Sequence, residues 1–292
     1  MNARPISYWT TIFRHYAGVL IVGAFLFANI FIWSAVFAEE RSGVLVVAFL
    51  DVGQGDAIFI EAPNGSQMLV DGGPNSAVVR ELSRMMPFHD RSIDIVVATH
   101  PDKDHIAGLV DVFERYEVGR YLDPAVEHDS GVYLALQNAV EEEGIERTLA
   151  RRGMRIALDE GVYADILFPD RDVSTVETNL GSIIMKVVYG ETEFLLTGDA
   201  PQAIEKYLVA QDVEGLRSDV LKAGHHGSKT SSAEDFVGFV NPHTAIISAG
   251  KDNSYGHPHK EVLDTFKKFG IEIRSTAEEG TIVFRSDGAT LR

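Results

Sequence analysis

His100-Pro101-Asp102-Lys103-Asp104-His105 is the stretch of this 292-residue chain that decides its fold. It follows a nearly continuous apolar run, Ile93 to Ala98, which is typical of a strand buried on both faces. A helix is predicted directly after it, from Ile106 to Tyr116. Imidazole and carboxylate groups at the end of a buried strand are a ligand set suited to Zn²⁺ or Mn²⁺. Helix capping alone would explain one of the acids and neither histidine.

Further potential metal ligands stand where other predicted strands end. Asp71 follows one apolar run, Asp199 follows another, and His225-His226 follow a third. Taken singly, Asp71-Gly72-Gly73 is also compatible with a turn, and Asp199 with a helix cap. Six of the ten histidines fall in three places, at His100 and His105, His225 and His226, and His257 and His259. This joint occurrence favours a single metal-binding pocket.

The order of the predicted elements indicates an α/β fold. Three strands, 44–49, 57–61 and 67–70, form an antiparallel meander, and Pro63-Asn64-Gly65 is a good turn between the last two. Further strands are predicted at 93–98, 164–168, 183–189, 193–197, 220–222, 244–248, 271–274 and 281–284, and helices at 76–86, 106–116, 132–143, 200–210, 233–240 and 260–269. Strands followed by helices, twice along the chain, predict an αββα four-layer sandwich over 44–292.

An apolar segment without any charge precedes this domain. If helical, it is long enough to span a bilayer. Arg4 and Arg14 come before it, and Glu39 and Glu40 come after it, an asymmetry that predicts a cytoplasmic N-terminus and an exported remainder. The predicted parts are a cytoplasmic segment at 1–16, a single transmembrane anchor at 17–38 and a linker at 39–43.

A cleaved signal peptide is the alternative for the same segment. Val36-Phe37-Ala38 offers small residues for a cut before Glu39. The apolar region exceeds the roughly 7–15 residues of a signal core, which favours the uncleaved anchor. Cleavage would make the protein secreted, whereas the anchor would keep an extracytoplasmic domain on the cell membrane. A buried helix of a soluble domain is the third and least favoured reading.

Composition limits the chemistry of the domain. The chain has no cysteine, so disulfides, thiolate ligands and a thiolate nucleophile are excluded. Its formal net charge of −17 disfavours extended, sequence-independent binding to nucleic acid. A metal site would still provide the local positive charge that an anionic substrate needs.

Several motifs together resemble a known family. They are Asp51-Val52-Gly53-Gln54-Gly55-Asp56, Leu69-Val70-Asp71-Gly72-Gly73, the run from His100 to His105, Leu196-Thr197-Gly198-Asp199, His225-His226-Gly227-Ser228 and Tyr255-Gly256-His257-Pro258. These motifs resemble the metallo-β-lactamase-fold domain of ComEC-type competence proteins. The similarity covers the chain from about Val44 to its C-terminus.

The resemblance implies one or two divalent ions, Zn²⁺ or Mn²⁺, in the pocket. The implied ligands are His100 and Asp102 at a first metal position, Asp104 and His105 at a second, and Asp199 between them. His226 is favoured to complete the second position and His225 to face the substrate, but adjacent residues exchange faces, so the opposite assignment stays open.

Two departures from the broader superfamily concern the first metal position. The superfamily usually shows His-x-His-x-Asp-His, and Asp102 stands at the second histidine here. Asn179-Leu180-Gly181-Ser182 aligns where a further histidine ligand is usual. Both changes resemble the competence-protein branch, and additional oxygen ligands shift the preference from Zn²⁺ toward Mn²⁺ or Mg²⁺.

The remaining site residues are assigned by their place in the same motifs. Asp71 is expected to support the ligands from behind, and His225 or His257 to stabilise charge or protonate the leaving group. Asp104 is expected to be essential for activity. The candidate substrate contacts are Asn179, Ser182, Ser228, Asn253 and Tyr255.

A phosphodiesterase, or a nuclease acting on single-stranded DNA outside the membrane, is the function that the resemblance favours. The sequence lacks the many membrane helices of a full-length competence protein, so a part in DNA uptake would require a channel protein as partner. One alternative is the hydrolysis of small envelope esters such as phosphocholine esters. Another is a non-catalytic accessory module of an uptake system.

Overall fold

The protein consists of two compact units, Met1–Gly43 and Val44–Arg292. The structure is a computed structural model that describes residues 6–41 and 43–292, with the side chains of 16–34 and 43–292. Arg4 lies outside the described residues, as do the side chains of Arg14, Glu39, Glu40 and 36–38. The membrane orientation inferred from these charges therefore stays a prediction.

A single apolar helix, α1, runs from Ile6 to Arg41. Its Tyr16–Ser34 stretch has a mean hydropathy of 2.1, so by length and composition it is able to cross a membrane or to act as a signal sequence. Asn29 donates to the carbonyl of Phe25, and Ser34 to that of Phe31, so both polar side chains are satisfied within the helix. The helix extends beyond the predicted span into the segments predicted as 1–16 and 39–43.

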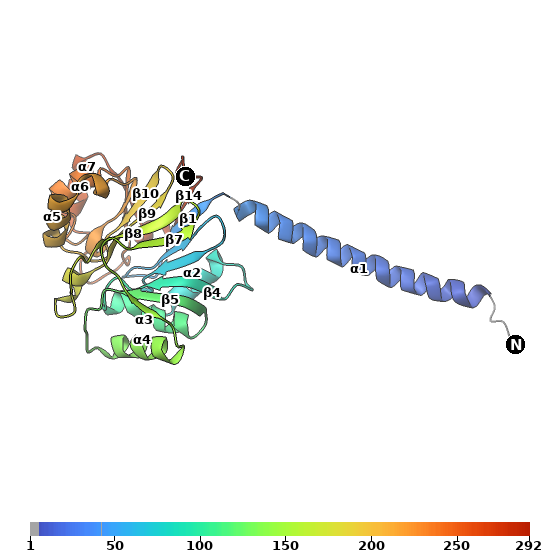
Figure 1. Ribbon diagram of the computed structural model, residues 1–292. Coiled ribbons are helices and arrows are strands. Elements are labelled where there is room, and N and C mark those ends of the chain that lie inside the picture. The colour runs from blue at the N-terminus through green and yellow to red at the C-terminus, as the bar shows by residue number, and fades with distance from the viewer. Residues whose placement is uncertain (1–5, 42) are drawn as a thin grey trace. The chain divides into compact units, whose positions relative to one another are not determined.

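Two seven-stranded sheets form the centre of the second unit (Figure 1). In spatial order, the first sheet contains β14 (Ile282–Ser286), β1 (Leu45–Phe49), β2 (Ile58–Glu61), β3 (Gln67–Val70), β4 (Ser92–Val97), β5 (Glu117–Asp123) and β6 (Arg147–Leu149). The second contains β13 (Glu272–Ser275), β12 (Thr244–Ile247), β11 (Val220–Lys222), β10 (Thr192–Leu196), β9 (Ile184–Tyr189), β8 (Val162–Phe168) and β7 (Arg155–Asp159).

Helices cover the outer face of each sheet. The first sheet carries α2 (Ala77–Met85), α3 (Lys103–Phe113) and α4 (Gly131–Glu142), and the second carries α5 (Gln202–Gln211), α6 (Glu234–Val240) and α7 (Lys260–Lys268). Short helices occur at α8 (Thr276–Glu279), η1 (Thr178–Gly181), η2 (Glu214–Leu216) and η3 (Gly224–Gly227). The predicted αββα sandwich is confirmed.

Alternation along the strands divides the apolar side chains between three cores, one between the sheets and one under the helices of each sheet. Val47 and Phe49 of β1 lie in the core between the sheets, whereas Ala48 belongs to the core under the helices of the first sheet. Phe284 bridges the central core, with ring centroids 6.1 Å from Phe49 and 5.8 Å from Phe194. These edge-on ring contacts hold the two sheets face to face.

Strand direction decides where the polar loops meet. The predicted meander is confirmed, since β1, β2 and β3 pair in antiparallel fashion. By contrast, β4 runs parallel to β3, and β11 runs parallel to both β10 and β12. Parallel strands bring their carboxyl ends to the same edge of a sheet, so the loops that follow β3, β4, β10 and β11 are the ones that can share a site.

The structure differs from the prediction in three strands and at the start of one helix. The strands β5, β6 and β7 were not predicted, because their polar and apolar residues show no sustained run. The predicted start of this helix at Ile106 was wrong, because α3 begins at Lys103. Asp102 takes the extended conformation of an N-cap, so Asp104 and His105 lie in the first helical turn instead of in a loop.

Candidate metal centre

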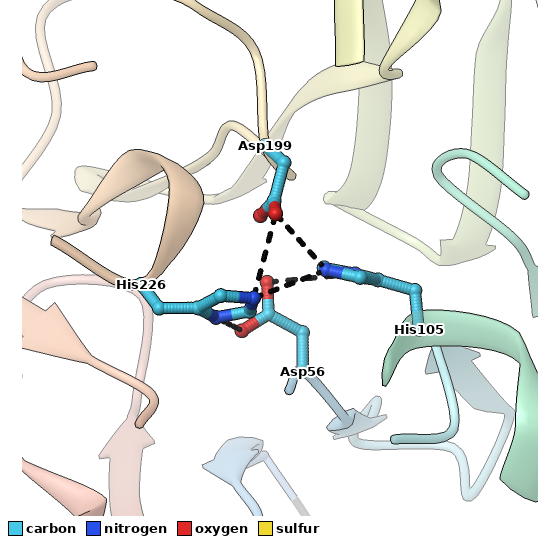
Figure 2. Close-up of side chains that lie close together, drawn as sticks. All are labelled: Asp56, His105, Asp199 and His226. Carbon is cyan, nitrogen blue, oxygen red and sulfur yellow. Dashed lines mark hydrogen bonds and ion pairs between the residues drawn. The ribbon is translucent and has the colours of Figure 1, made fainter. Parts of the chain in front are cut away.

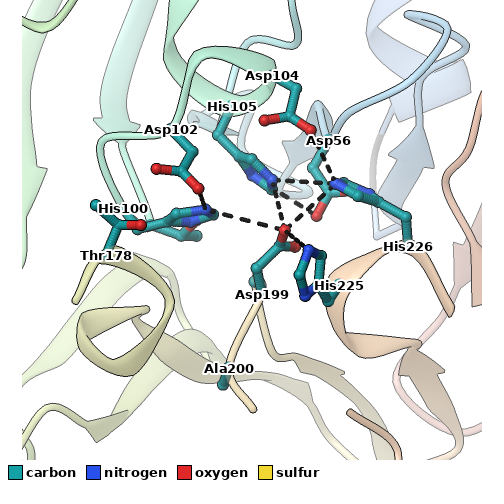
Figure 3. A network of polar contacts seen from close by, with 12 residues as sticks. Asp56, His100, Asp102, Asp104, His105, Thr178, Asp199, Ala200, His225 and His226 are labelled. Carbon is teal, nitrogen blue, oxygen red and sulfur yellow. Dashed lines mark hydrogen bonds and ion pairs between the residues drawn. The ribbon is translucent and has the colours of Figure 1, made fainter. Parts of the chain in front are cut away.

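Three segments that are distant in the sequence deliver side chains to one pocket (Figures 2 and 3). His100 follows β4, and Asp104 and His105 project from the first turn of α3. Asp199 follows β10, and His226 lies in η3 after β11. Both sheets therefore contribute, and His100, His105, Asp199 and His226 are all buried.

The innermost part of the pocket is a set of ligand atoms at nearly equal spacing. His105 Nε2 and His226 Nε2 lie 3.3 Å apart, and Asp199 Oδ2 lies 3.3 Å from the first and 3.4 Å from the second. Asp104 Oδ2 is 3.3 Å from His226 Nε2. Ligands bound to zinc at about 2.0–2.2 Å in a tetrahedron stand about 3.3–3.6 Å from one another. This spacing fits a divalent cation.

A second ligand group adjoins the first through Asp199. His100 Nε2 lies 3.7 Å from Asp102 Oδ2 and 4.0 Å from Asp199 Oδ2, which is too far for a hydrogen bond. This nitrogen is buried and has no hydrogen-bond partner among the described residues. A buried, unsatisfied imidazole nitrogen that faces two carboxylates fits a bound cation. Asp102 forms no capping bond, contrary to the capping alternative.

Asp71 fixes the orientation of His105. Its Oδ2 lies 2.8 Å from His105 Nδ1 and accepts from the Thr99 hydroxyl at 2.7 Å, while its Oδ1 accepts from the Thr99 backbone N–H at 2.7 Å. The carboxylate keeps the imidazole proton on Nδ1, so Nε2 presents a lone pair to the pocket. Asp71 thus lies buried behind His105 and forms no simple surface turn, and its support of a metal ligand stays a prediction.

The two adjacent histidines reach the same carboxylate because both adopt left-handed backbone conformations. Their φ angles are 49° for His225 and 55° for His226. As a result, His225 Nε2 lies 3.6 Å from Asp199 Oδ2 on the opposite side from His105. Residues other than glycine are strained in this region, and such strain concentrates at functional sites. His226 is buried whereas 28% of the His225 side chain is exposed, which supports His226 as the ligand.

Two residues of this centre, Asp56 and Lys222, were not assigned from the sequence. Ligand atoms of Asp56, His105, Asp199 and His226 all lie within 4.8 Å of one another. Asp56 nevertheless faces the Nδ1 atoms, at 3.3 Å from His226 and 3.9 Å from His105, and so lies behind these rings rather than with their Nε2 atoms. Lys222 forms a short ion pair with Asp56 Oδ2.

The signals for these two residues were present but weak. Asp56 closes the motif that begins at Asp51, which the resemblance includes without a role. Lys222 is the only charged residue of β11, and all three residues of that strand are buried. A lysine at the end of a buried strand requires an anionic partner, which sequence alone could not identify.

Gly55 allows the Asp56 loop to approach the start of α3. Its φ is 136°, and a Cβ built on it would lie 2.1 Å from the carbonyl oxygen of Asp104. The neighbouring Asp56 N–H donates to this same carbonyl at 3.3 Å. The glycine therefore sets the distance between Asp56 and the ligands of α3.

Charge in the pocket shifts the pKa values of its members. Burial alone would raise the pKa of Asp199, but His226, His105 and His100 hold it well below its ordinary value. Burial would also raise the pKa of Asp56, and Lys222 with the histidines lowers it instead. Burial opposes protonation of His226, yet Asp199 and Asp56 raise its pKa to about 9. The pocket thus strongly favours positive charge.

The segment from Asn179 to Ser182, expected from the resemblance to stand where a further histidine ligand is usual, borders the His100 side of the pocket. Ser182 is fully buried, and its hydroxyl has no hydrogen-bond partner among the described side chains. Asn179 Oδ1 is likewise buried without a partner. Thr178, the residue before it, lies beside Asp102 and His100 (Figure 3). The structure thus places oxygen-bearing side chains beside His100.

The loop from Asn253 to His259 lies at the opposite side. Its rings are close, with centroids 5.7 Å apart for Tyr255 and His257, and 5.6 Å for His225 and His257. Tyr255 is 64% exposed, and His257 Nδ1 is buried without a partner in the described chain. Burial and the neighbouring histidines lower the pKa of His257 to about 4.

Two further predicted substrate contacts are engaged within their own loops. Asn253 donates to the carbonyls of Gly250 and His257 and accepts from the His257 N–H, so its amide braces this loop. Ser228 is buried, and its hydroxyl accepts from Thr230. Both lie beside the centre, and a direct role with substrate stays a prediction.

Curated relatives include proteins of bacterial competence and recombination. The chain is 30% identical over 256 residues to ComE operon protein 3 of Bacillus subtilis, covering 82% of this chain and 33% of that protein. It is 31% identical over 238 residues to Recombination protein 2 of Haemophilus influenzae, covering 80% of this chain and 28% of that protein. The chain therefore spans about a third of the length of these relatives.

Solved structures share the fold at low sequence identity. One is CmlA, a diiron beta-hydroxylase from Streptomyces venezuelae, with a TM-score of 0.54 and 15% identity over 83% of this chain and 54% of that one. Another is Igni18, a metallo hydrolase from Ignicoccus hospitalis, with a TM-score of 0.50 and 14% identity over 82% of this chain and 98% of that one. The metallo-beta-lactamase superfamily matches residues 50–251, and the chain belongs to this superfamily.

Proposed function

We propose that the protein is a metal-dependent phosphodiesterase that acts outside the cytoplasmic membrane, with single-stranded DNA as its leading substrate. The observation that carries this proposal is the convergence of His105 Nε2, His226 Nε2 and Asp104 Oδ2 around Asp199 Oδ2, with His100 Nε2 and Asp102 Oδ2 on its other side. Asp199 Oδ2 is the atom common to both groups, as expected of a bridging ligand.

The charge of the pocket favours two divalent cations. The carboxylates are those of Asp56, Asp71, Asp102, Asp104 and Asp199. Among the described side chains, the one ammonium that pairs with them is that of Lys222, so four negative charges remain when the histidines are neutral. The group with His105 and His226 suits Zn²⁺ or Mn²⁺, and the group with His100 and Asp102 is richer in oxygen and suits Mn²⁺.

Such a pair of ions would activate water and stabilise charge on phosphoryl oxygens. The chain itself would orient the ligands, through Asp71 behind His105 and through the strained His225-His226 turn. His225 and His257 lie beside each other at the pocket, with ring centroids 5.6 Å apart, and their lowered pKa values keep both imidazoles neutral. Each would therefore stabilise charge on a leaving oxygen by donating a hydrogen bond. Tyr255, exposed beside His257, is placed to contact substrate.

The net charge bears on the choice between large and small substrates. A charge of −17 repels a long polyphosphate backbone, so nucleic-acid binding would have to be confined to the pocket and its rim. A small phosphodiester with a cationic group, such as a phosphocholine ester, matches the acidic surface, and the Tyr255 ring offers a cation–π contact. This is the second candidate function.

The proposed location follows from the sequence around α1. Arginines before the apolar stretch and glutamates after it favour a cytoplasmic N-terminus and an extracytoplasmic domain, anchored by α1 or released by signal cleavage. An uptake channel is the partner that the competence relatives suggest.

Hydrolysis assays on the full chain in detergent test the proposal. The substrates are end-labelled single-stranded DNA, bis-(p-nitrophenyl) phosphate and p-nitrophenyl phosphorylcholine, each with Mn²⁺ or Zn²⁺. We expect cleavage that Asp104→Ala abolishes. The matched control is Asp111→Ala, on the same helix but paired with Arg115 at 3.9 Å instead of with a residue of the pocket, and it should retain activity.

Each outcome of this assay separates the hypotheses. Cleavage of DNA supports the nuclease, and cleavage of the phosphocholine ester alone replaces it by the second candidate. A protein that binds metal but cleaves none of the three is better described as the accessory module. Activity that survives Asp104→Ala would contradict the proposed centre altogether.

A further inference from the structure

We propose that the buried Lys222–Asp56 ion pair is a positioning device for two metal ligands, His226 and Asp199, and that neither Lys222 nor Asp56 binds the metal itself. This inference rests on the proposed metal centre and adds to it a lysine and an aspartate outside the ligand set. Neither residue was assigned a role from the sequence.

Lys222 stands at the back of the pocket with no access to solvent. Its side chain is 0% exposed, and its ammonium forms a short ion pair with Asp56 Oδ2. The same ammonium lies 3.4 Å from the carbonyl oxygen of Gly198 and 3.9 Å from Asp199 Oδ1. One cation therefore touches both the carboxylate behind His226 and the carboxylate that faces all the pocket histidines.

Asp56 acts on the far side of the His226 ring. Its Oδ1 is 3.3 Å from His226 Nδ1, and the carbonyl oxygen of Ser248 is 2.9 Å from the same nitrogen. The Ser248 carbonyl accepts the hydrogen bond from Nδ1, and the Asp56 carboxylate adds negative charge beside the same nitrogen, so Nε2 is left with its lone pair toward Asp104 and Asp199. Asp56 thus supports the charge of the His226 ring from behind, whereas Asp71 holds His105 by a direct 2.8 Å bond.

Lys222 also distinguishes the two oxygens of Asp199. Oδ2 faces His100, His105, His225 and His226 at 3.3–4.0 Å. Oδ1 faces Lys222 instead, and it has no hydrogen-bond partner among the described residues. The lysine attracts one oxygen away from the pocket and leaves the other facing it, so Oδ2 is the oxygen of Asp199 that would be available to a metal.

Fold stability gives little reason for charges at these two positions. A buried ion pair is often no more stabilising than apolar residues of similar volume, because both charges must leave water. Val220 and Leu221, the other residues of β11, are apolar and buried. The position of Lys222 thus suits an apolar side chain, so the pair has to be explained by the groups that it touches.

The test separates positioning from folding by removing both charges together. The variants are Lys222→Met, Asp56→Asn and the double variant, each made in the full chain in detergent. Lys260→Met with Asp264→Asn is the matched control, because it removes an exposed ion pair on α7. Co²⁺ is the probe. Its affinity is measured by calorimetry, its ligand geometry by visible absorption, and folding by circular dichroism without metal.

We expect each single variant to unfold at lower temperature, because it leaves one buried charge unpaired. The double variant should recover the unfolding temperature but bind Co²⁺ about 10–100-fold more weakly than the wild type, with an altered absorption spectrum. The surface control should match the wild type in all three measurements.

A double variant with wild-type affinity and spectrum would overturn the inference and leave the ion pair as a folding element only. A wild-type protein that binds no Co²⁺, Zn²⁺ or Mn²⁺ would instead overturn the proposed function, and the inference with it. The two failures are thus distinguished by the wild-type measurement.

Discussion

The substitution Asp71→Asn replaces one carboxylate oxygen by an NH₂ group and should move the ring proton of His105 from Nδ1 to Nε2. The carboxylate accepts three hydrogen bonds, two from Thr99 at 2.7 Å and one from His105 Nδ1 at 2.8 Å. An asparagine that keeps its oxygen on the Thr99 N–H turns its NH₂ toward Nδ1. That nitrogen must then accept, so the ring proton moves to Nε2, which can no longer bind a cation.

The magnitude follows from the bonds that are lost or reversed. Substituting a hydrogen-bonding partner behind a metal ligand typically weakens metal affinity 10–100-fold, which equals about 1.4–2.7 kcal/mol. Asp71 holds His105 by a single short bond, so we expect the upper half of this range. Folding should suffer by about 1–3 kcal/mol as well, because buried donors and acceptors lose their match.

Calorimetric titration of the full chain with Zn²⁺ measures the affinity. The matched control is Asp94→Asn, since Asp94 Oδ2 also accepts a 2.7 Å hydrogen bond from a backbone N–H, that of Gln67 on the neighbouring strand, but stands near the start of β4. The control should bind Zn²⁺ as the wild type does. Unchanged affinity in Asp71→Asn would refute the assignment of His105 Nε2 as a ligand atom.

Three further predictions concern pH, loop approach and the core. Burial raises the pKa of Glu205 from 4.5 to about 7, so its stabilising effect is full below pH 4.5 and is lost as pH rises through 7. The unfolding free energy of the wild type relative to Glu205→Gln should therefore fall by about 2.5 kcal/mol from pH 5 to pH 8. It is measured by far-ultraviolet circular dichroism in urea, and a flat difference would mean that the two backbone hydrogen bonds offset burial. Gly55→Ala should cost more than the roughly 1–3 kcal/mol of backbone strain alone and should weaken Zn²⁺ binding. Gly65→Ala is the comparison, because Gly65 also has a positive φ but a Cβ there meets no atom within 4 Å, so its loss of stability measures backbone strain alone. Phe194→Ala should destabilise the fold by about 3–5 kcal/mol in the same denaturation assay, whereas the half-exposed Phe239→Ala should change it little.

The sequence predicted the parts of the fold whose residues carry a strong local pattern. Apolar runs such as 67–70 and 220–222 were located to the residue, because a buried strand is unambiguous when turn residues bound it. Candidate ligands could be proposed for a related reason, since His100, Asp199 and the His225-His226 pair follow such runs, and the resemblance added Asp102, Asp104 and His105. The N-terminus of α3 was missed because Lys103, Asp104 and His105 give its first turn no apolar periodicity.

Tertiary pairing could not be obtained in the same way. Asp56 and Lys222 are 166 positions apart in the sequence and meet only because both sheets close over them. The strand β5 alternates poorly, since only Tyr121, Leu122 and Asp123 are buried and the rest lies toward the edge of the sheet. The secondary structure and the contacts of such residues depend on their neighbours in space, which a single sequence does not reveal.

The division of the ligands between the two sheets links cation binding to the closure of the sandwich. The groups after β4 belong to one half, and those after β10 and β11 belong to the other. Neither half alone can surround an ion, so a cation would bind the closed domain in preference to any partly open form and would lower the rate and extent of opening by mass action. Removal of the cation by a chelator should accordingly favour opening between the two sheets. Amide hydrogen exchange should then become faster in the loops that follow β4, β10 and β11 before it becomes faster in the outer helices.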